Sequence, residues 1–131
     1  MDLNSSNLKY LAINLNETDF HYQSLGVLKK KAILPSLKKL EIQIENAIVC
    51  HQNVKNLFDY IGENGEKLEY LHLNLAHTPV SNDCIYFLKE KVLPSLKYLE
   101  DFKINLFSTL VSERNKDFQH IGKAAMKVMN K

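Results

Sequence analysis

A pattern that occurs four times along the chain is the feature that most constrains its fold. The pattern reads Φ-x-Φ-x-Φ-x-x-[Thr/Ala]-x-Φ, where Φ is a large apolar residue, and its copies span residues 11–20, 40–49, 71–80 and 102–111. The first positions of successive copies are 29, 31 and 31 residues apart. Aligned columns at such regular spacing are typical of repeat proteins, in which each repeat is one supersecondary unit.

Each copy of the pattern predicts a short strand that is followed by a helix. Apolar residues at every second position bury one face of a strand, so we expect parallel strands, adjacent in chain order within one sheet, near residues 11–15, 40–44, 71–75 and 102–106. The apolar spacing between them predicts helices over 23–34, 54–63 and 81–93. Prolines in two Leu-Pro-Ser-Leu segments, 34–37 and 93–96, are expected to end helices. The segment 62–65 is expected to form the intervening turn, in which Gly62 and Gly65 are free to adopt positive φ.

The C-terminal residues predict a closing helix over about 112–130 that caps the stack. Phe118, Ile121, Ala125 and Val128 would share one face of this helix, with charged residues elsewhere. The chain is therefore interpreted as one domain, 1–131, with repeats at about 8–36, 37–67, 68–98 and 99–131.

The strand pattern and its period resemble leucine-rich repeat proteins of the long, ribonuclease-inhibitor-like type, over about residues 8–111. The resemblance implies an α/β solenoid of about four strand–helix repeats, with a parallel sheet on the concave side and helices on the convex side. Members of this family mostly bind proteins. This chain departs from the family at one column, where asparagine or cysteine is usual and Thr18, Ala47, Thr78 and Thr109 occur. A hydroxyl group replaces part of the asparagine's bonding, but Ala47 has none, so the turn in the second repeat is expected to be looser or more hydrated.

Polar residues alternate with the apolar ones and should form columns on the concave face. The first column is Ala12, Glu41, His72 and Lys103, the second is Asn14, Gln43, Asn74 and Asn105, and the third is Asn16, Glu45, Ala76 and Phe107. Each amide of the second column is expected to bond to the next, either as a structural ladder or with ladder ends that bind a partner. The candidate binding residues on this face are Tyr10, Asn14, Gln43, Tyr70, His72, Asn74, Lys103, Asn105 and Phe107.

Several functional classes are disfavoured by composition and spacing. The net charge is only +2 and Arg114 is the sole arginine, which argues against nucleic-acid binding. No apolar run approaches the ~20 residues of a membrane span, and the start of the chain has no signal-peptide pattern. Two cysteines are too few for a disulfide framework, so we expect a cytoplasmic protein.

Neither a metal site nor a catalytic site is predicted. The residues that invite a zinc interpretation match no zinc-ligand spacing; they are Cys50, His51, His72, His77 and Cys84. Glu41, His72 and Lys103 should be neighbours, but they lack a nucleophile, an oxyanion site and cover from water. We therefore expect no cofactor and no enzyme activity.

The sequence thus predicts a non-catalytic protein-interaction module or assembly subunit that binds through the concave face. A second predicted contact is the N-terminal strand Leu8–Leu15, because only Met1–Asn7 precede it and cannot cap a repeat. That edge would pair with a second copy or with a larger assembly. The alternative function is substrate recognition within a larger enzyme, such as a ubiquitin-ligase receptor or a kinase.

Overall fold

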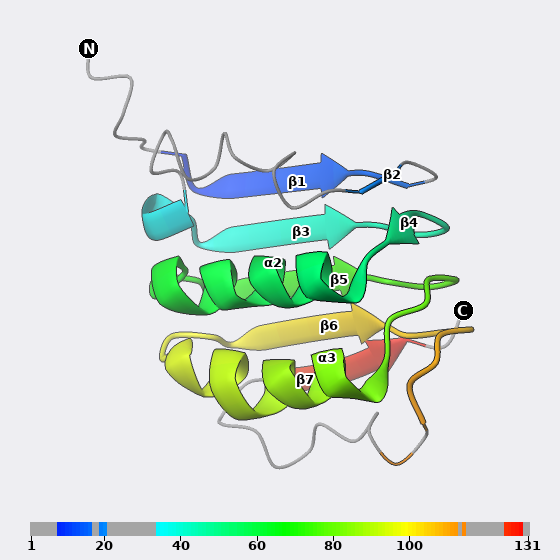
Figure 1. The fold of residues 1–131 in the computed structure, drawn as a ribbon. Helices are drawn as coiled ribbons and strands as arrows, with labels where there is room; N and C mark the ends of the chain where they lie inside the picture. Colours follow the sequence, from blue (N-terminus) through cyan, green and yellow to red (C-terminus); the bar gives the residue numbers. More distant parts are fainter. Residues whose placement is uncertain (1–7, 17–18, 21–33, 113, 115–124, 130–131) are drawn as a thin grey trace.

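The computed structural model describes residues 8–16, 19–20, 34–112, 114 and 125–129, which form an α/β fold with helices against a parallel sheet (Figure 1). The four predicted strands are β1 (Tyr10–Asn14), β3 (Lys39–Gln43), β5 (Tyr70–Asn74) and β6 (Asp101–Asn105). They are parallel and adjacent in chain order. Their predicted positions, which differ by one residue at each end, and their order are confirmed.

The repeats align in register, so that Leu11, Leu40, Leu71 and Phe102 pair in succession across the sheet. The apolar residues of β3, β5 and β6 are buried, and those of the first strand are partly buried against the same core. This burial confirms the predicted apolar face, because shifting any strand by one residue would expose its whole apolar set.

Two helices among the described residues pack against the apolar face of the sheet (Figure 1). Helix α2 (His51–Asn64) buries Val54, Leu57, Phe58 and Ile61, and α3 (Asn82–Phe87) buries Ile85. Helix α3 continues into the π-helical turn η3 (Leu88–Val92) and the 3-10 turn η4 (Leu93–Ser95). The predicted helices over 54–63 and 81–93 are thus confirmed in outline. No helix in these described ranges combines the length and apolarity needed to cross a membrane.

The first predicted helix, over 23–34, lies outside the described residues except for its last one. Leu34 begins the 3-10 turn η2 (Leu34–Ser36), which matches η4 in sequence and in conformation. Proline at the second position of each turn lacks a backbone N–H group, and helix starts tolerate that loss. In η4, the Ser95 hydroxyl donates to the carbonyl oxygens of Val92 at 2.6 Å and Gly62 at 3.0 Å, which joins η4 to helix α2.

The turn between α2 and β5 forms without the positive φ that its glycines are free to adopt. Gly65 caps α2 with φ at −92°. Glycine is needed there for space, because a Cβ atom would lie 2.7 Å from Leu68 Cδ1 and 2.8 Å from the Ile61 carbonyl oxygen.

Positive φ angles occur instead at one equivalent position after each of three strands, at Asn46, His77 and Ser108 (φ 57–58°). In the next column, the Thr78 hydroxyl donates to the Leu75 carbonyl at 2.6 Å, and Thr109 makes the matching bond at 2.7 Å. Ala47 lacks a hydroxyl, and its backbone N–H donates to the Ile44 carbonyl at 3.2 Å. Thr18 lies outside the described residues, and the looser turn expected at Ala47 stays a prediction. Beyond this turn, β2 (Asp19–Phe20) and β4 (Ile48–Val49) form a second, two-stranded parallel sheet.

The predicted closing helix over 112–130 is wrong for residues 125–129, which form strand β7 (Ala125–Met129). β7 pairs in parallel with β6 and adds a fifth strand to the sheet, with Met126 opposite Phe102 and Val128 opposite Ile104. The segment also alternates apolar residues with Lys127, and pairing with β6 gives its backbone groups hydrogen-bond partners. Phe118 and Ile121 lie outside the described residues.

Candidate functional site

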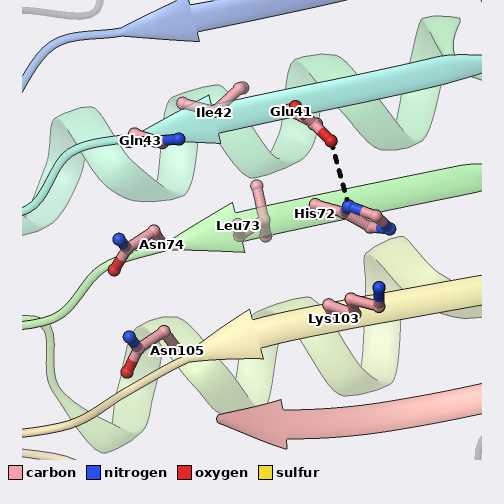
Figure 2. A pocket seen from close by; sticks show the side chains of 8 residues that line it. All are labelled: Glu41, Ile42, Gln43, His72, Leu73, Asn74, Lys103 and Asn105. Carbon is pink, nitrogen blue, oxygen red and sulfur yellow. Dashed lines mark hydrogen bonds and ion pairs between the residues drawn. The ribbon is translucent and has the colours of Figure 1, made fainter. Parts of the chain in front are cut away.

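The face of the sheet opposite α2 and α3 carries the polar residues that alternate with the buried ones (Figures 1 and 2). We call it the polar face, and it is defined by the strand residues Tyr10, Asn14, Lys39, Glu41, Gln43, Tyr70, His72, Asn74, Asp101, Lys103 and Asn105. With Phe107, two residues after the end of β6, these include all the predicted binding residues. The parallel register therefore brings the predicted set together on one surface.

Glu41 in β3 is the centre of the hydrogen bonds on this face. Its Oε2 accepts from the Tyr10 hydroxyl at 2.8 Å, and its Oε1 lies 3.2 Å from His72 Nδ1 and 3.5 Å from Lys39 Nζ. The hydrogen bond from Tyr10 is the main reason why the pKa of the Glu41 carboxyl lies below its ordinary value. The same bond raises the pKa of the Tyr10 hydroxyl. The sequence placed Glu41 beside His72 but gave no sign of the bond to Tyr10.

His72 in β5 lies between two carboxylates. Its Nδ1 contacts Glu41 and must donate there, because an ionised carboxylate only accepts. Its Nε2 is 3.5 Å from Asp101 Oδ2, and this buried nitrogen makes no hydrogen bond in the structure. The expected neighbours Glu41 and His72 are thus bonded to each other (Figure 2).

A cation lies between two aromatic rings along the same edge of the polar face. Lys39 Nζ is 5.2 Å from the centre of the Tyr10 ring and 6.0 Å from that of Tyr70. Cation–π attraction at such distances favours these ring positions, in addition to the hydrogen bond from Tyr10 to Glu41. Tyr10 and Tyr70 remain 49% and 38% exposed, so both residues leave apolar surface open to solvent.

The amide side chains of the second column, Asn14, Gln43, Asn74 and Asn105, do not form the predicted ladder of bonds from each amide to the next. The side-chain oxygens of Asn14, Asn74 and Asn105 accept from the backbone N–H two residues on, at 2.9, 3.1 and 3.0 Å. Asparagine is short enough to close this local turn at the end of a strand, and the local bond competes with cross-strand pairing. The amide oxygens therefore stabilise strand ends.

Gln43 occupies the same column in β3, and there Asn16, which follows β1, accepts the hydrogen bond from the backbone two residues beyond the column. The Asn16 side-chain oxygen accepts from the Glu45 N–H, two residues after Gln43, at 2.7 Å. Asn16 Nδ2 in turn donates to Gln43 Oε1 at 3.3 Å. Asn74 Nδ2 donates across to Glu45 Oε1 at 3.0 Å, so the side chains are linked diagonally between strands.

A hollow of about 220 Å³ lies in the middle of the polar face (Figure 2). Its lining comes from three neighbouring strands and consists of Glu41, Ile42, Gln43, His72, Leu73, Asn74, Lys103 and Asn105. Lys103 extends toward the strand that carries His72. Asn105 is only 7% exposed, which makes it the least accessible of the predicted binding residues.

A second cluster, formed by His51, Ser81 and Cys84, joins the first turns of α2 and α3. The contact between these three side chains was not predicted from the sequence. Cys84 Sγ lies 3.4 Å from His51 Nδ1, and the Ser81 hydroxyl is 3.0 Å from the same nitrogen. Cys84 is buried, and burial raises the pKa of its thiol, which disfavours the nucleophilic thiolate. The separation of 33 residues, close to the repeat period, is the signal that would have placed His51 against Cys84.

The side chains that line the hollow are amides, ionisable groups and aliphatic groups. No residue that lines the hollow carries a hydroxyl or thiol group. Within the ranges that the structure describes, no three histidine, cysteine or acidic residues are grouped so as to hold a metal ion. No family model, curated protein or solved structure matches this chain, so the polar face itself carries the functional conclusion.

Proposed function

We propose that this chain is a leucine-rich repeat module of the ribonuclease-inhibitor-like type, which binds a protein partner through its polar face and catalyses no reaction. In-register parallel strands, helices on one side and the recurrent turn after each strand support this assignment. The polar face would then be the concave surface of the solenoid. The single observation that carries the proposal is that exposed aromatic residues lie on the same surface as a polar hollow.

Tyr10, Tyr70 and Phe107 are the aromatic residues concerned, and Phe107 is 42% exposed. A ring in polar surroundings offers a large apolar contact, and tyrosine and other aromatics are frequent anchors of interfaces. The Phe107 ring meets the His77 ring edge-on, with 5.4 Å between centres, so it is held in place as Tyr70 is held by Lys39. Side chains that are already ordered lose less entropy when a partner binds.

The N-terminal edge of the sheet provides a second proposed contact, for another copy or a larger assembly. Leu8 is 39% exposed, and the apolar residues of β1 are less buried than their equivalents in β3. Among the described strands of this sheet, β3 alone pairs with β1. A strand edge with free N–H and C=O groups favours pairing with another chain. Ala12→Pro should then weaken self-association, which sedimentation measures. The backbone amides of β5 and β6 should keep their protection against hydrogen exchange in this variant.

The proposed setting is the cytoplasm, where an exposed thiol such as that of Cys50 stays reduced. Recognition of a substrate on behalf of a larger enzyme, such as a ubiquitin ligase or a kinase, would use the same polar face. The two functions differ in whether a catalytic domain accompanies the module in the complete assembly.

Capture of partners with paired tyrosine variants tests the proposal. Tyr70→Ala removes a ring from the polar face, and Tyr86→Ala removes a ring that is 62% exposed on helix α3. Wild type, Tyr70→Ala and Tyr86→Ala would be used as baits, and quantitative mass spectrometry would compare the bound proteins. We expect a partner that the wild type and Tyr86→Ala retain and Tyr70→Ala loses, with all three melting at similar temperatures. Loss in Tyr86→Ala alone would move the binding surface to the helices.

A further inference from the structure

The central row of the polar face changes from acidic to basic across the sheet. Register pairs Ala12 with Glu41, Glu41 with His72, His72 with Lys103, and Lys103 with Lys127 of β7. Among the strands whose side chains the structure describes, the row thus runs from the carboxylate of Glu41 in β3 to the ammonium group of Lys103 in β6.

The acidic end of the row is already satisfied within the chain. Glu41 accepts from Tyr10 at 2.8 Å and lies within ion-pair distance of Lys39 and His72. The basic end differs, because Lys103 Nζ forms no hydrogen bond or ion pair within the part of the chain that the structure describes. Among the described residues, the charge in the hollow that lacks an opposite partner is therefore positive.

The amides that line the hollow favour the same kind of ligand. Asn74 and Asn105 use their oxygens to accept backbone N–H groups, and the oxygen of Gln43 accepts from Asn16. These bonds fix which end of each amide is the oxygen, so the acceptors are occupied. Gln43 Nε2 has no partner among the described residues, and Asn74 Nδ2 has a second hydrogen beyond the one given to Glu45. The hollow thus offers an ammonium group and N–H donors, which is what a carboxylate requires.

We infer that the hollow binds an acidic side chain of the protein partner, whose carboxylate accepts from Lys103 Nζ and from the amides of Gln43 and Asn74. The inference rests on the proposed function, because it specifies the partner as a protein segment rich in aspartate or glutamate. A nucleic acid fits less well, because a single lysine among amides lacks the cluster of basic side chains that phosphate backbones favour.

Amide NMR titration with short peptides tests this inference. Acetylated hexaglutamate is the probe, hexaglutamine is its uncharged control, and inorganic phosphate and a single-stranded oligonucleotide are the competing anions. We expect hexaglutamate to shift the resonances of His72, Lys103 and Asn105, and its affinity to fall as salt rises from about 25 to 150 mM. Hexaglutamine should produce no such shifts.

Matched lysine variants locate the binding charge. Lys103→Gln should weaken hexaglutamate binding about tenfold, and Lys103→Arg should retain most of the affinity. Lys91→Gln removes the same charge from an exposed position in η3, and it should bind as the wild type does. The amide spectrum of each variant also reports whether it is folded.

Apart from a failure of hexaglutamate to bind at the hollow, three results would overturn the inference. They are equal binding of hexaglutamine, an equal loss in Lys91→Gln, and tighter binding of phosphate or the oligonucleotide at the hollow. Failure of hexaglutamate at the hollow, with a partner still lost by Tyr70→Ala, would remove the acidic ligand and leave the proposed function intact. If Tyr70→Ala retains every partner while hexaglutamate binds at the hollow, the hollow binds an acidic ligand but the proposed function of the polar face is refuted.

Discussion

Truncation of Leu73 to alanine should destabilise the whole described sheet. Leu73 is 3% exposed and lies in β5, which pairs with β3 on one side and β6 on the other. The change removes about three carbon groups from the core at ~0.8 kcal/mol each, or about 2.4 kcal/mol of transfer free energy. The cavity left behind adds to this loss, so we expect the free energy of unfolding to fall by about 3–4 kcal/mol.

Urea unfolding followed by circular dichroism and by tyrosine fluorescence measures this loss. Leu110→Ala is the matched control, because Leu110 is 67% exposed and its truncation should cost less than about 0.5 kcal/mol. Both probes should give one midpoint for Leu73→Ala, because β5 pairs with both β3 and β6 and its loss would remove support from each. A loss below about 1 kcal/mol, or an equal loss in Leu110→Ala, would refute the placement of this strand at the centre of the core.

Three further predictions follow from the local geometry. Ser108→Gly should raise the free energy of unfolding by about 0.5 kcal/mol in the same urea assay, because glycine adopts the positive φ of residue 108 without the cost that serine incurs. A free energy of unfolding below that of the wild type would argue against a positive φ at this residue. A thiol reagent should modify exposed Cys50 quickly and buried Cys84 only after unfolding, and two fast thiols in the native protein would contradict the burial of Cys84. Tyr10→Phe should raise the pKa of Glu41 in a carbon-detected NMR titration, since it removes the main hydrogen bond that lowers it. The stability that this bond gives is present above the ordinary glutamate pKa of about 4.3 and disappears as pH falls through the lower folded-state value, so stability should fall less on acidification in Tyr10→Phe than in the wild type.

The strands and their order could be predicted because the apolar columns admit only one register. A residue shift in β5 would move Leu71 and Leu73 from the core to the polar face, so the sequence contains strong information about pairing. The same register predicted that Glu41, His72 and Lys103 would be neighbours. Most of the candidate site therefore follows from alternation and period alone.

The remaining features depend on short-range choices that periodicity does not encode. Ala125 and Val128 have the spacing of one helix face, whereas Met126 and Val128 have the alternating spacing of a strand. The sequence of this segment therefore fits both structures, and pairing with β6 favours the strand. Positive φ occurs at residues other than glycine, so composition gave no sign of the turn at His77. The asparagine oxygens could bond to a neighbouring strand or to their own backbone, and the nearer donor is the one they use.

Radical footprinting of the protein with and without its captured partner tests the central claim most directly. Four exposed tyrosines serve as reporters, with Tyr10 and Tyr70 on the polar face, Tyr86 on α3 and Tyr98 in the turn before β6. The account predicts that the partner reduces oxidation of Tyr10 and Tyr70 and leaves Tyr86 and Tyr98 unchanged. Protection of Tyr86 or Tyr98, with Tyr10 and Tyr70 oxidised as in the free protein, would contradict binding through the polar face.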